Sequence, residues 1–168
     1  MGNNTPHKRR LASNFSTDQE SPGLGLWRLS NTWQAHQRRA LVPFGLTHVQ
    51  FVLLASLVWL EGDTPITQNQ LAHFAHVDPM MTSQVLRALE KKGLLRRERH
   101  PGDARARALI ATPEGVAVAN RANSAVEEAD ATFFAALTVD ERVFFTQILA
   151  RLNEEAPRSA PEPGTQRH

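Results

Sequence analysis

The chain has 168 residues, of which 41% are hydrophobic and 21% are charged, the composition of an ordinary globular domain. It contains no cysteine, which excludes disulfide bonds, thiolate metal ligands and cysteine nucleophiles. The longest apolar run, residues 51–60, is too short for a membrane-spanning helix, which needs roughly 20 residues, and the N-terminus lacks the apolar stretch of a secretory signal. We therefore expect a cytoplasmic protein without a membrane partner.

The formal net charge is only +2, but the charges are segregated along the chain. Residues 87–107 carry eight Lys or Arg against three acids, whereas residues 112–156 carry three against eight. A block of charge +5 beside a block of charge −5 predicts one face for a polyanion and another face for a different partner.

Both ends of the chain have the composition of flexible tails. Residues 1–22 are rich in Asn, Ser, Thr and Pro, and residues 156–168 contain three prolines and almost nothing apolar. We predict a disordered N-terminal tail over 1–22, one folded domain over 23–155 and a disordered C-terminal tail over 156–168.

Helix signals follow one another through the first half of the domain. Helical spacing of apolar residues predicts a first helix over 25–42. Thr47 and Gln50 have the form of a capping box before the apolar run 51–60, which we interpret as a buried helix. Residues 64–66 form a short extended link. A second capping box, Thr67 to Gln70, begins a short helix that runs to about residue 75.

The second half begins with a helix predicted over 79–92, with Asp78 as its N-cap and Gly93 after its end. Two short strands are expected over 94–99 and 105–110, joined by residues of turn composition. A long helix then follows Thr112, with apolar residues that continue to about residue 137, and a third capping box at 138–141 begins the last helix.

This order of elements is that of a winged helix-turn-helix. We predict a mainly α protein with a small β-wing, in which a reader over about 47–111 lies between dimerisation helices over about 25–42 and 112–154. In such a reader the second helix of the pair enters the major groove of DNA, and the tip of the hairpin reaches the adjacent minor groove.

The predicted recognition helix has two chemically different faces. Val85, Leu86 and Leu89 are expected to face the core, and the opposite face carries groups that read base edges and phosphates. Met80 also lies on that outer face. Two roles are possible for its side chain: contact with a thymine methyl group, or packing against the preceding helix. The candidate DNA contacts on this helix and at its end are Ser83, Gln84, Arg87, Lys91 and Lys92.

The hairpin supplies a second set of candidate DNA contacts. Asp103 lies two residues before Arg105, where its carboxylate is expected to orient the guanidinium toward the minor groove. An ordinary turn with solvated arginines is the alternative, and the preceding pair of helices favours DNA. The hairpin candidates are Arg97, Arg99, Asp103, Arg105 and Arg107.

The stretch 71–112 resembles the core of the MarR family of bacterial transcription regulators. Residues 85–97 are similar to that family's recognition-helix end and first wing strand, Asp103-Ala104-Arg105 to its wing motif, and residues 112–115 to its next helix start. The resemblance spans about residues 24–154. It implies a homodimer joined by the first helix and the last two, a pseudo-palindromic double-stranded DNA operator, repression rather than activation, and release by a small aromatic ligand.

In the family fold, the segments around the first two helices flank a cleft between the dimerisation helices and the reader. Aromatic rings with a few polar groups make an acceptable pocket for a small aromatic or anionic effector. Core and dimer packing is the alternative for each ring. The candidate ligand-binding residues are Trp27, Trp33, His36, Phe44, His48 and Phe51.

Other kinds of function find little support in the sequence. No catalytic triad order, phosphate-binding glycine loop or metal-hydrolase helix is visible, so we do not expect an enzyme. His73 and His76 are three residues apart, but cysteine is absent and nearby carboxylates are few. We therefore predict no metal and no cofactor. Whether these two histidines bind a metal is a question that the sequence leaves open. The remaining alternative is a winged-helix module that binds protein, against which the +5 block argues.

Overall fold

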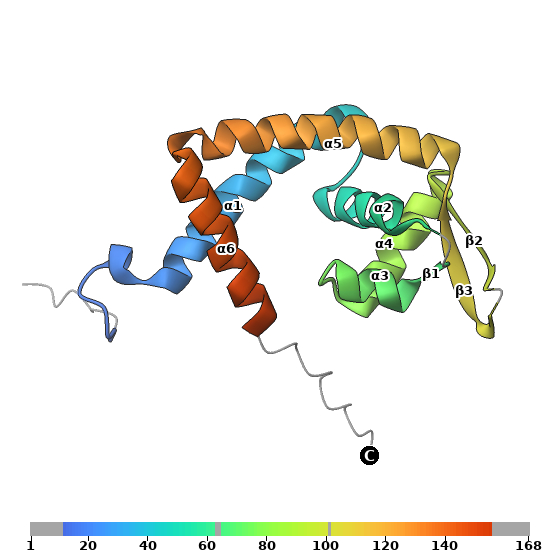
Figure 1. The fold of residues 1–168 in the computed structure, drawn as a ribbon, viewed down its shortest axis with the longest axis horizontal. Helices are drawn as coiled ribbons and strands as arrows, with labels where there is room; N and C mark the ends of the chain where they lie inside the picture. Colours follow the sequence, from blue (N-terminus) through green and yellow to red (C-terminus); the bar gives the residue numbers. More distant parts are fainter. Residues whose placement is uncertain (1–11, 63–64, 101, 156–168) are drawn as a thin grey trace, which may run out of the picture.

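In the computed structural model the chain is described over residues 12–62, 65–100 and 102–155. Figure 1 shows α5 running along one side of the molecule, with the reader under one end and α1 and α6 at the other. The structure confirms the predicted fold class, mainly helical with a small sheet. The elements are η1 (Asp18–Glu20), α1 (Pro22–Leu41), η2 (Val42–Phe44), α2 (His48–Leu60), β1 (Ile66–Thr67), α3 (Gln68–Phe74), α4 (Pro79–Lys91), β2 (Leu95–His100), β3 (Asp103–Ala111), α5 (Pro113–Phe133), η3 (Phe134–Ala136) and α6 (Val139–Glu155).

All three predicted capping boxes are present. The hydroxyl groups of Thr47 and Thr67 accept from the amides of Gln50 and Gln70, whose side chains accept from the threonine amides in return. Thr138 and Glu141 make the same exchange at the start of α6, and the hydrogen bonds from Thr138 lower the pKa of the Glu141 carboxyl. Each box satisfies amides that a helix start leaves free, which is why these local patterns predict the starts.

Leucines from the helices and the two long strands of the reader form its core. Those of α2, α3, α4 and β2 with at most 2% exposure are Leu53, Leu54, Leu57, Leu71, Leu86, Leu89 and Leu95. The same buried cluster continues along α5 through Val118, Ala122 and Val126. The reader and α5 therefore share one core, so α5 is attached to the reader through packed side chains and not only through the chain.

The wing is an antiparallel sheet of order β1-β3-β2. β3 is longer than predicted, because it begins at Asp103 and ends at Ala111, whereas β2 has the predicted length but is shifted by one residue, with an irregularity between Arg99 and His100. The predicted link 64–66 also ends in a strand, since Ile66 pairs with Leu109 of β3. The turn that joins β2 and β3 is accordingly shorter than the sequence indicated.

The helix boundaries in the structure differ from the predicted ones at two places. α1 begins at Pro22, three residues before the predicted start, because the Ser21 hydroxyl caps it, and Asp18 of the preceding turn lies 2.7 Å from Arg28 of α1. Residues 18–22 are thus folded, although the predicted tail included them. The long helix ends at Phe133, followed by a 3₁₀ turn, and not near residue 137. Residues 12–17 of the predicted tail are exposed and contain no helix or strand, and the other parts, residues 1–11 and 156–168, lie outside the described residues.

Gly115 joins α5 to the reader at close range. A Cβ atom on this residue would lie 1.8 Å from the carbonyl oxygen of Leu94, a separation that no side chain tolerates. Thr112 completes the joint, since its hydroxyl donates to the Gly93 carbonyl at 2.7 Å and accepts from the Gly115 amide at 3.0 Å. The direction of α5 is therefore set by direct contact with the end of the recognition-helix segment.

Within the described ranges, no single helix is long and apolar enough to cross a membrane. The pair formed by residues 22–44 and 48–60 meets the length and composition requirement only when joined, and the two are bent by 74° relative to each other.

Candidate nucleic-acid interface

The recognition helix α4 turns a fully buried side inward and a polar side outward. Thr82, Leu86 and Leu89 have no exposed surface, whereas Gln84, Arg87 and Lys91 are exposed and Ser83 is half-buried. Nη2 of Arg87 donates to the Ser83 hydroxyl at 3.1 Å, which holds the guanidinium along the outer face of the helix. The prediction from the periodicity, that these groups share the outer face, agrees with the structure.

Lys92 is placed differently from the prediction. Its amine donates to the Gly45 carbonyl at 2.5 Å and to Oε1 of Gln50 at 2.8 Å. These contacts tie the end of α4 to the start of α2, so two of its three protons are used inside the protein. Lys92 helps to position the recognition helix, and because it is exposed and keeps one donor, its contact with a phosphate stays a prediction.

The wing arginines lie on the side of the sheet that faces the helices. Arg97 pairs across the strands with Leu109, and Arg99 with Arg107, so all four share the face that carries buried Leu95. Arg99 and Arg107 are exposed farther toward the tip. Of these arginines, Arg97 contacts α4, and Arg99 and Arg107 remain exposed and available to a charged DNA backbone.

Arg97 departs from the predicted role as a simple DNA contact. It is half-buried, and its Nε lies 3.4 Å from Oε2 of Glu90 on α4. Within the described part of the chain, its Nε and Nη2 are buried without a hydrogen-bond partner. Arg97 therefore connects the wing to the recognition helix, and its unused donors remain beside the adjacent cavity.

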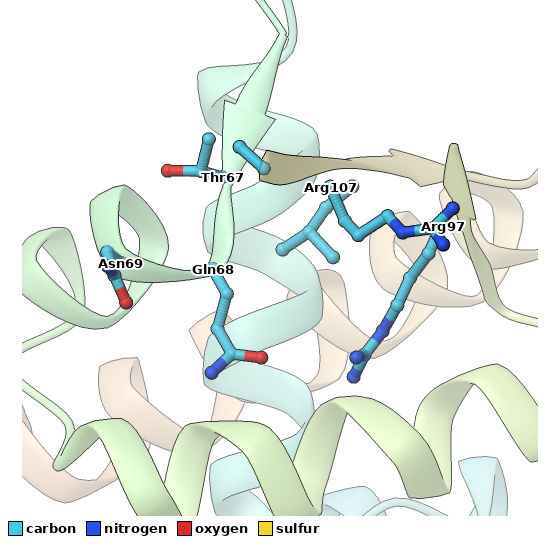
Figure 2. A pocket seen from close by; sticks show the side chains of 7 residues that line it. Thr67, Gln68, Asn69, Arg97 and Arg107 are labelled. Atoms are coloured by element: carbon cyan, nitrogen blue, oxygen red, sulfur yellow. The ribbon is translucent and has the colours of Figure 1, made fainter. Parts of the chain in front are cut away.

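A cavity of about 220 Å³ lies between the start of α3 and the wing. Figure 2 shows Arg107 reaching across toward Arg97, with the amide of Gln68 on the opposite side above α4. Thr67 and Asn69 complete the polar lining, together with Ala106 and Leu109. Two guanidinium groups and several uncharged donors around one recess make it suitable for an anion such as a DNA phosphate.

The side chains of Asp103 and Arg105 lie outside the described residues. Their backbone belongs to β3, nearer to the turn than Arg107. The orientation of Arg105 by Asp103 therefore stays a prediction. Arg96, which the sequence analysis did not select, forms an ion pair with Glu98 at 2.6 Å.

A polar cluster at the junction of α1, α2 and α5 contains two of the predicted ligand residues. Oδ1 of Asp130 accepts from Nε1 of Trp33 at 2.7 Å and from Nε2 of Gln37 at 2.6 Å. The rings of Trp33 and His48 meet edge to face, with centroids 5.1 Å apart. We call Trp33, Gln37, His48 and Asp130 the junction cluster.

Gln37 and Asp130 were missed by sequence reasoning. Gln37 follows Trp33 by one helical turn, a signal that could have identified it. Asp130 had no such signal, because it lies 97 residues from Trp33 along the chain and only the packing of α5 on α1 joins them. The side chain of Gln37 has no exposed surface. Among the described residues, its Oε1 has no hydrogen-bond partner.

Burial lowers the pKa of His48. The carboxylate of Asp130 acts in the opposite direction, and the nearby Arg38 adds to the lowering. The lowered pKa favours the neutral imidazole, so this side chain offers a hydrogen-bonding ring rather than a cation to a bound molecule.

The six predicted ligand residues do not form one pocket. Phe51 belongs to the buried core, Trp27 is 66% exposed, and Phe44 is half-buried in the turn after α1. His36 meets Phe133 edge to face at 5.4 Å near the end of α5. Among the described residues the structure brings Trp33 and His48 together, and ligand binding by any of the six stays a prediction.

An extended apolar surface remains uncovered at the end of α5 farthest from the wing. It comprises Leu26, Trp27, Leu29, Val139, Val143, Phe144, Leu149 and Leu152, all exposed, and is called the apolar surface below. No residue of α6 is buried against the rest of the described chain. Figure 1 shows α1 and α6 at this end of the molecule.

The two histidines considered for metal binding do not belong to a larger ligand set. Across residues 12–62, 65–100 and 102–155, no group of three or more His, Cys, Asp or Glu is arranged to hold a metal ion. His76 takes a positive φ of 51° in the turn between α3 and α4. Its backbone conformation makes that turn, which places α4 against α3.

Comparison with known proteins identifies close relatives. Residues 46–106 match the sequence profile of the MarR family. The chain is 44% identical over 126 residues to YdcH of Bacillus subtilis (strain 168), an HTH-type transcriptional regulator itself described as uncharacterized, covering 74% of this chain and 85% of YdcH. It is 32% identical over 138 residues to the HTH-type transcriptional repressor Rv2887 of Mycobacterium tuberculosis, covering 82% and 97% of the two chains.

Solved structures agree with these relatives. A protein described as a probable transcriptional regulator from Pseudomonas aeruginosa superimposes with a TM-score of 0.74 at 26% identity, over 81% of this chain and 99% of that one. The structure of Rv2887 in complex with DNA superimposes with a TM-score of 0.61 at 32% identity, over 79% and 97% of the two chains.

Proposed function

Because the chain belongs to the MarR family of transcription regulators, we propose that it is a repressor that binds a pseudo-palindromic operator as a homodimer. The outer face of α4 carries this proposal. It presents Ser83, Gln84 and Arg87 beside Lys91, opposite a side that is fully buried. Hydroxyl, amide and guanidinium groups read base edges in the major groove, and the related repressor Rv2887 has been solved with DNA.

The wing contributes affinity in this proposal. Arg99 and Arg107 contact phosphates, and the recess between Arg97 and Arg107 accepts one of them. Arg105, retained from the sequence, enters the minor groove. Since each phosphate contact releases a counterion, binding weakens steeply as salt rises. The protein acts where the bacterial chromosome is, so the proposal includes a cytoplasmic location.

The homodimer rests on the apolar surface. Trp27 and Phe144 are each more than 60% exposed, and a monomer rarely leaves so many large apolar side chains uncovered together. A two-fold dimer through α1, α5 and α6 covers them. It also gives two copies of α4 the spacing of about one DNA turn that two half-sites require.

The effector in this proposal is a small aromatic molecule that binds at the junction cluster. The unpartnered Oε1 of Gln37 favours a ligand with a hydroxyl or amide donor. The Asp130 carboxylate disfavours an anionic group at the same point. Because the cluster joins α1, α2 and α5, a ligand there changes how the reader sits on the dimerisation helices, and hence the spacing of the two α4 helices.

The direct test is a titration of a fluorescent duplex from the region upstream of the protein's own gene, against a scrambled duplex, at two salt concentrations. We expect preferential binding that weakens with salt. Arg105→Ala should weaken it by about 1–3 kcal/mol without unfolding the protein. The control Arg121→Ala removes an exposed arginine of α5 that pairs with Glu114, and should leave binding unchanged.

The outcomes separate the alternatives. Equal binding to both duplexes would argue against this operator, and selection from a random duplex library would then search for another. No binding to any duplex at low salt would favour a winged-helix module that binds protein. Wild-type affinity in Arg105→Ala would contradict the wing assignment alone.

A further inference from the structure

Two neighbouring methionines lie exposed at the start of the recognition helix. Met80 is 73% exposed and Met81 is 49% exposed, in the first turn of α4. Both amides donate to Oδ1 of Asp78, at 2.8 and 2.9 Å, and the Thr82 hydroxyl donates to the Asp78 carbonyl at 2.8 Å. The backbone that carries the two thioethers is therefore held in place at both ends of the turn.

Met80 belongs to the outer face of α4 and not to its core side. It precedes Ser83, Gln84 and Arg87 by three, four and seven residues, the spacing that puts side chains on one helix face. The core side is occupied by Thr82, Leu86 and Leu89. The exposure of Met80 argues against packing on the preceding helix, which would have buried the side chain.

An apolar side chain on this face needs an apolar feature to contact. Base edges in the major groove present donors and acceptors, with one exception, the 5-methyl group of thymine. An unbranched thioether with three rotatable bonds adapts well to such a small target. Ser83 and Gln84 beside it supply the polar contacts that an adjacent base pair requires.

We propose that Met80 packs on the 5-methyl group of one thymine in each half-site and makes that position specific. This inference rests on the proposed function, since it requires α4 in the major groove. Removing one buried methyl contact costs about 0.8 kcal/mol, which corresponds to a loss of roughly four-fold in affinity per half-site. Met81 points to a different side of the helix and serves as the matched control.

The experiment uses the full-length protein and an operator that it selects from a random duplex library. Each thymine is then replaced in turn by deoxyuridine, which removes the methyl group and keeps the base pairing. Affinity is measured by fluorescence anisotropy at one salt concentration. For the wild type, we expect one thymine per half-site at which the replacement weakens binding about four-fold.

Variants assign that effect to Met80. Met80→Ala should bind the thymine and deoxyuridine duplexes equally, whereas Met81→Ala should keep the wild-type difference. Met80→Leu should retain part of the discrimination and Met80→Gln should lose it, because only the former keeps an apolar surface. Circular dichroism checks that each variant is folded. We expect the Met80 variants to be folded, because an exposed side chain contributes little to the core.

Two results would overturn the inference. One is a wild-type protein whose affinity is unchanged by deoxyuridine at every position. The other is a Met80→Ala variant that discriminates as the wild type does. Failure to select any duplex would overturn the proposed function, and this inference with it, so the two failures are distinguishable.

Discussion

The two ends of α5 differ in how completely the chain covers its own apolar surface. At the wing end, leucines from α2, α3, α4 and β2 are fully buried. At the other end, α6 buries no residue against the rest of the described chain, and Trp27 and Phe144 are exposed. The reader has a buried core of its own, whereas the far end leaves large apolar side chains exposed, which is the surface that the proposed homodimer would cover.

The two ends of α5 also differ in which part of the chain they contact. Near the wing, α5 contacts the reader directly through Gly115. Near its other end, α5 contacts α1 through the hydrogen bonds of Asp130. Because both contacts lie on one helix, α5 joins α1 to the reader through direct contacts at both ends. The predictions below test this arrangement, in order of decreasing effect.

The largest effect is expected from Gly115→Ala. The added Cβ would lie 1.8 Å from the Leu94 carbonyl oxygen, so backbone must move, and we expect a loss of more than about 3 kcal/mol in the free energy of unfolding. Urea denaturation measures it. The control Gly25→Ala, where a Cβ meets no described atom within 4 Å, should stabilise α1 by about 0.5–1 kcal/mol. Equal stability of the two variants would contradict the direct contact.

A charge on the apolar surface should separate the dimer without unfolding the reader. Phe144→Asp places a carboxylate where the proposed interface buries an aromatic ring. Sedimentation should show a monomer, and operator affinity should fall by more than about 100-fold, because one half-site no longer holds the other in place. Trp59→Asp, at an aromatic ring that is 82% exposed on α2 of the reader and outside the apolar surface, is the control and should remain dimeric. A dimeric Phe144→Asp would place the interface elsewhere.

Removing the shared acceptor of the junction cluster should have an intermediate effect. Asp130→Ala leaves the donors of Trp33 and Gln37 without their partner, and we expect a loss of about 2 kcal/mol in the free energy of unfolding. Asp130→Asn retains an acceptor oxygen and should recover most of it. If both variants are equally destabilised, the negative charge and not the hydrogen bonding is what the cluster requires.

The smallest effect is a pH dependence of stability from His48. Its pKa is lowered in the folded protein, chiefly by burial, so the unfolded chain binds more protons below the ordinary value of 6.5. Stability should therefore fall as pH drops from about 7 through 6.5 toward the lowered pKa. Urea denaturation across this range should show a weaker dependence in His48→Gln. An unchanged slope in that variant would assign the effect to another group.

Much of the fold was predictable because the signals are local. The starts of α2, α3 and α6 follow from threonine caps whose partners lie three residues away. The two faces of α4 follow from helical periodicity. The boundaries at 22 and 133 were missed because a serine cap and a 3₁₀ turn leave weaker patterns.

The roles of individual charged side chains were less predictable. Lys92 and Arg97 look alike in the sequence as members of a basic block. In the structure Lys92 binds the start of α2, and Arg97 lies beside Glu90 of α4. The charge of a residue is evident from its type, but its partner depends on which elements pack beside it.

The sequence by itself determined the helices, the wing and the outer face of the recognition helix, because caps, turns and periodicity act over a few residues. Only the tertiary structure decided the junction cluster, the contact at Gly115 and the exposure of Met80. Trp33 and Asp130 are 97 residues apart along the chain. No local pattern relates such residues, and their contact exists only because α5 packs on α1.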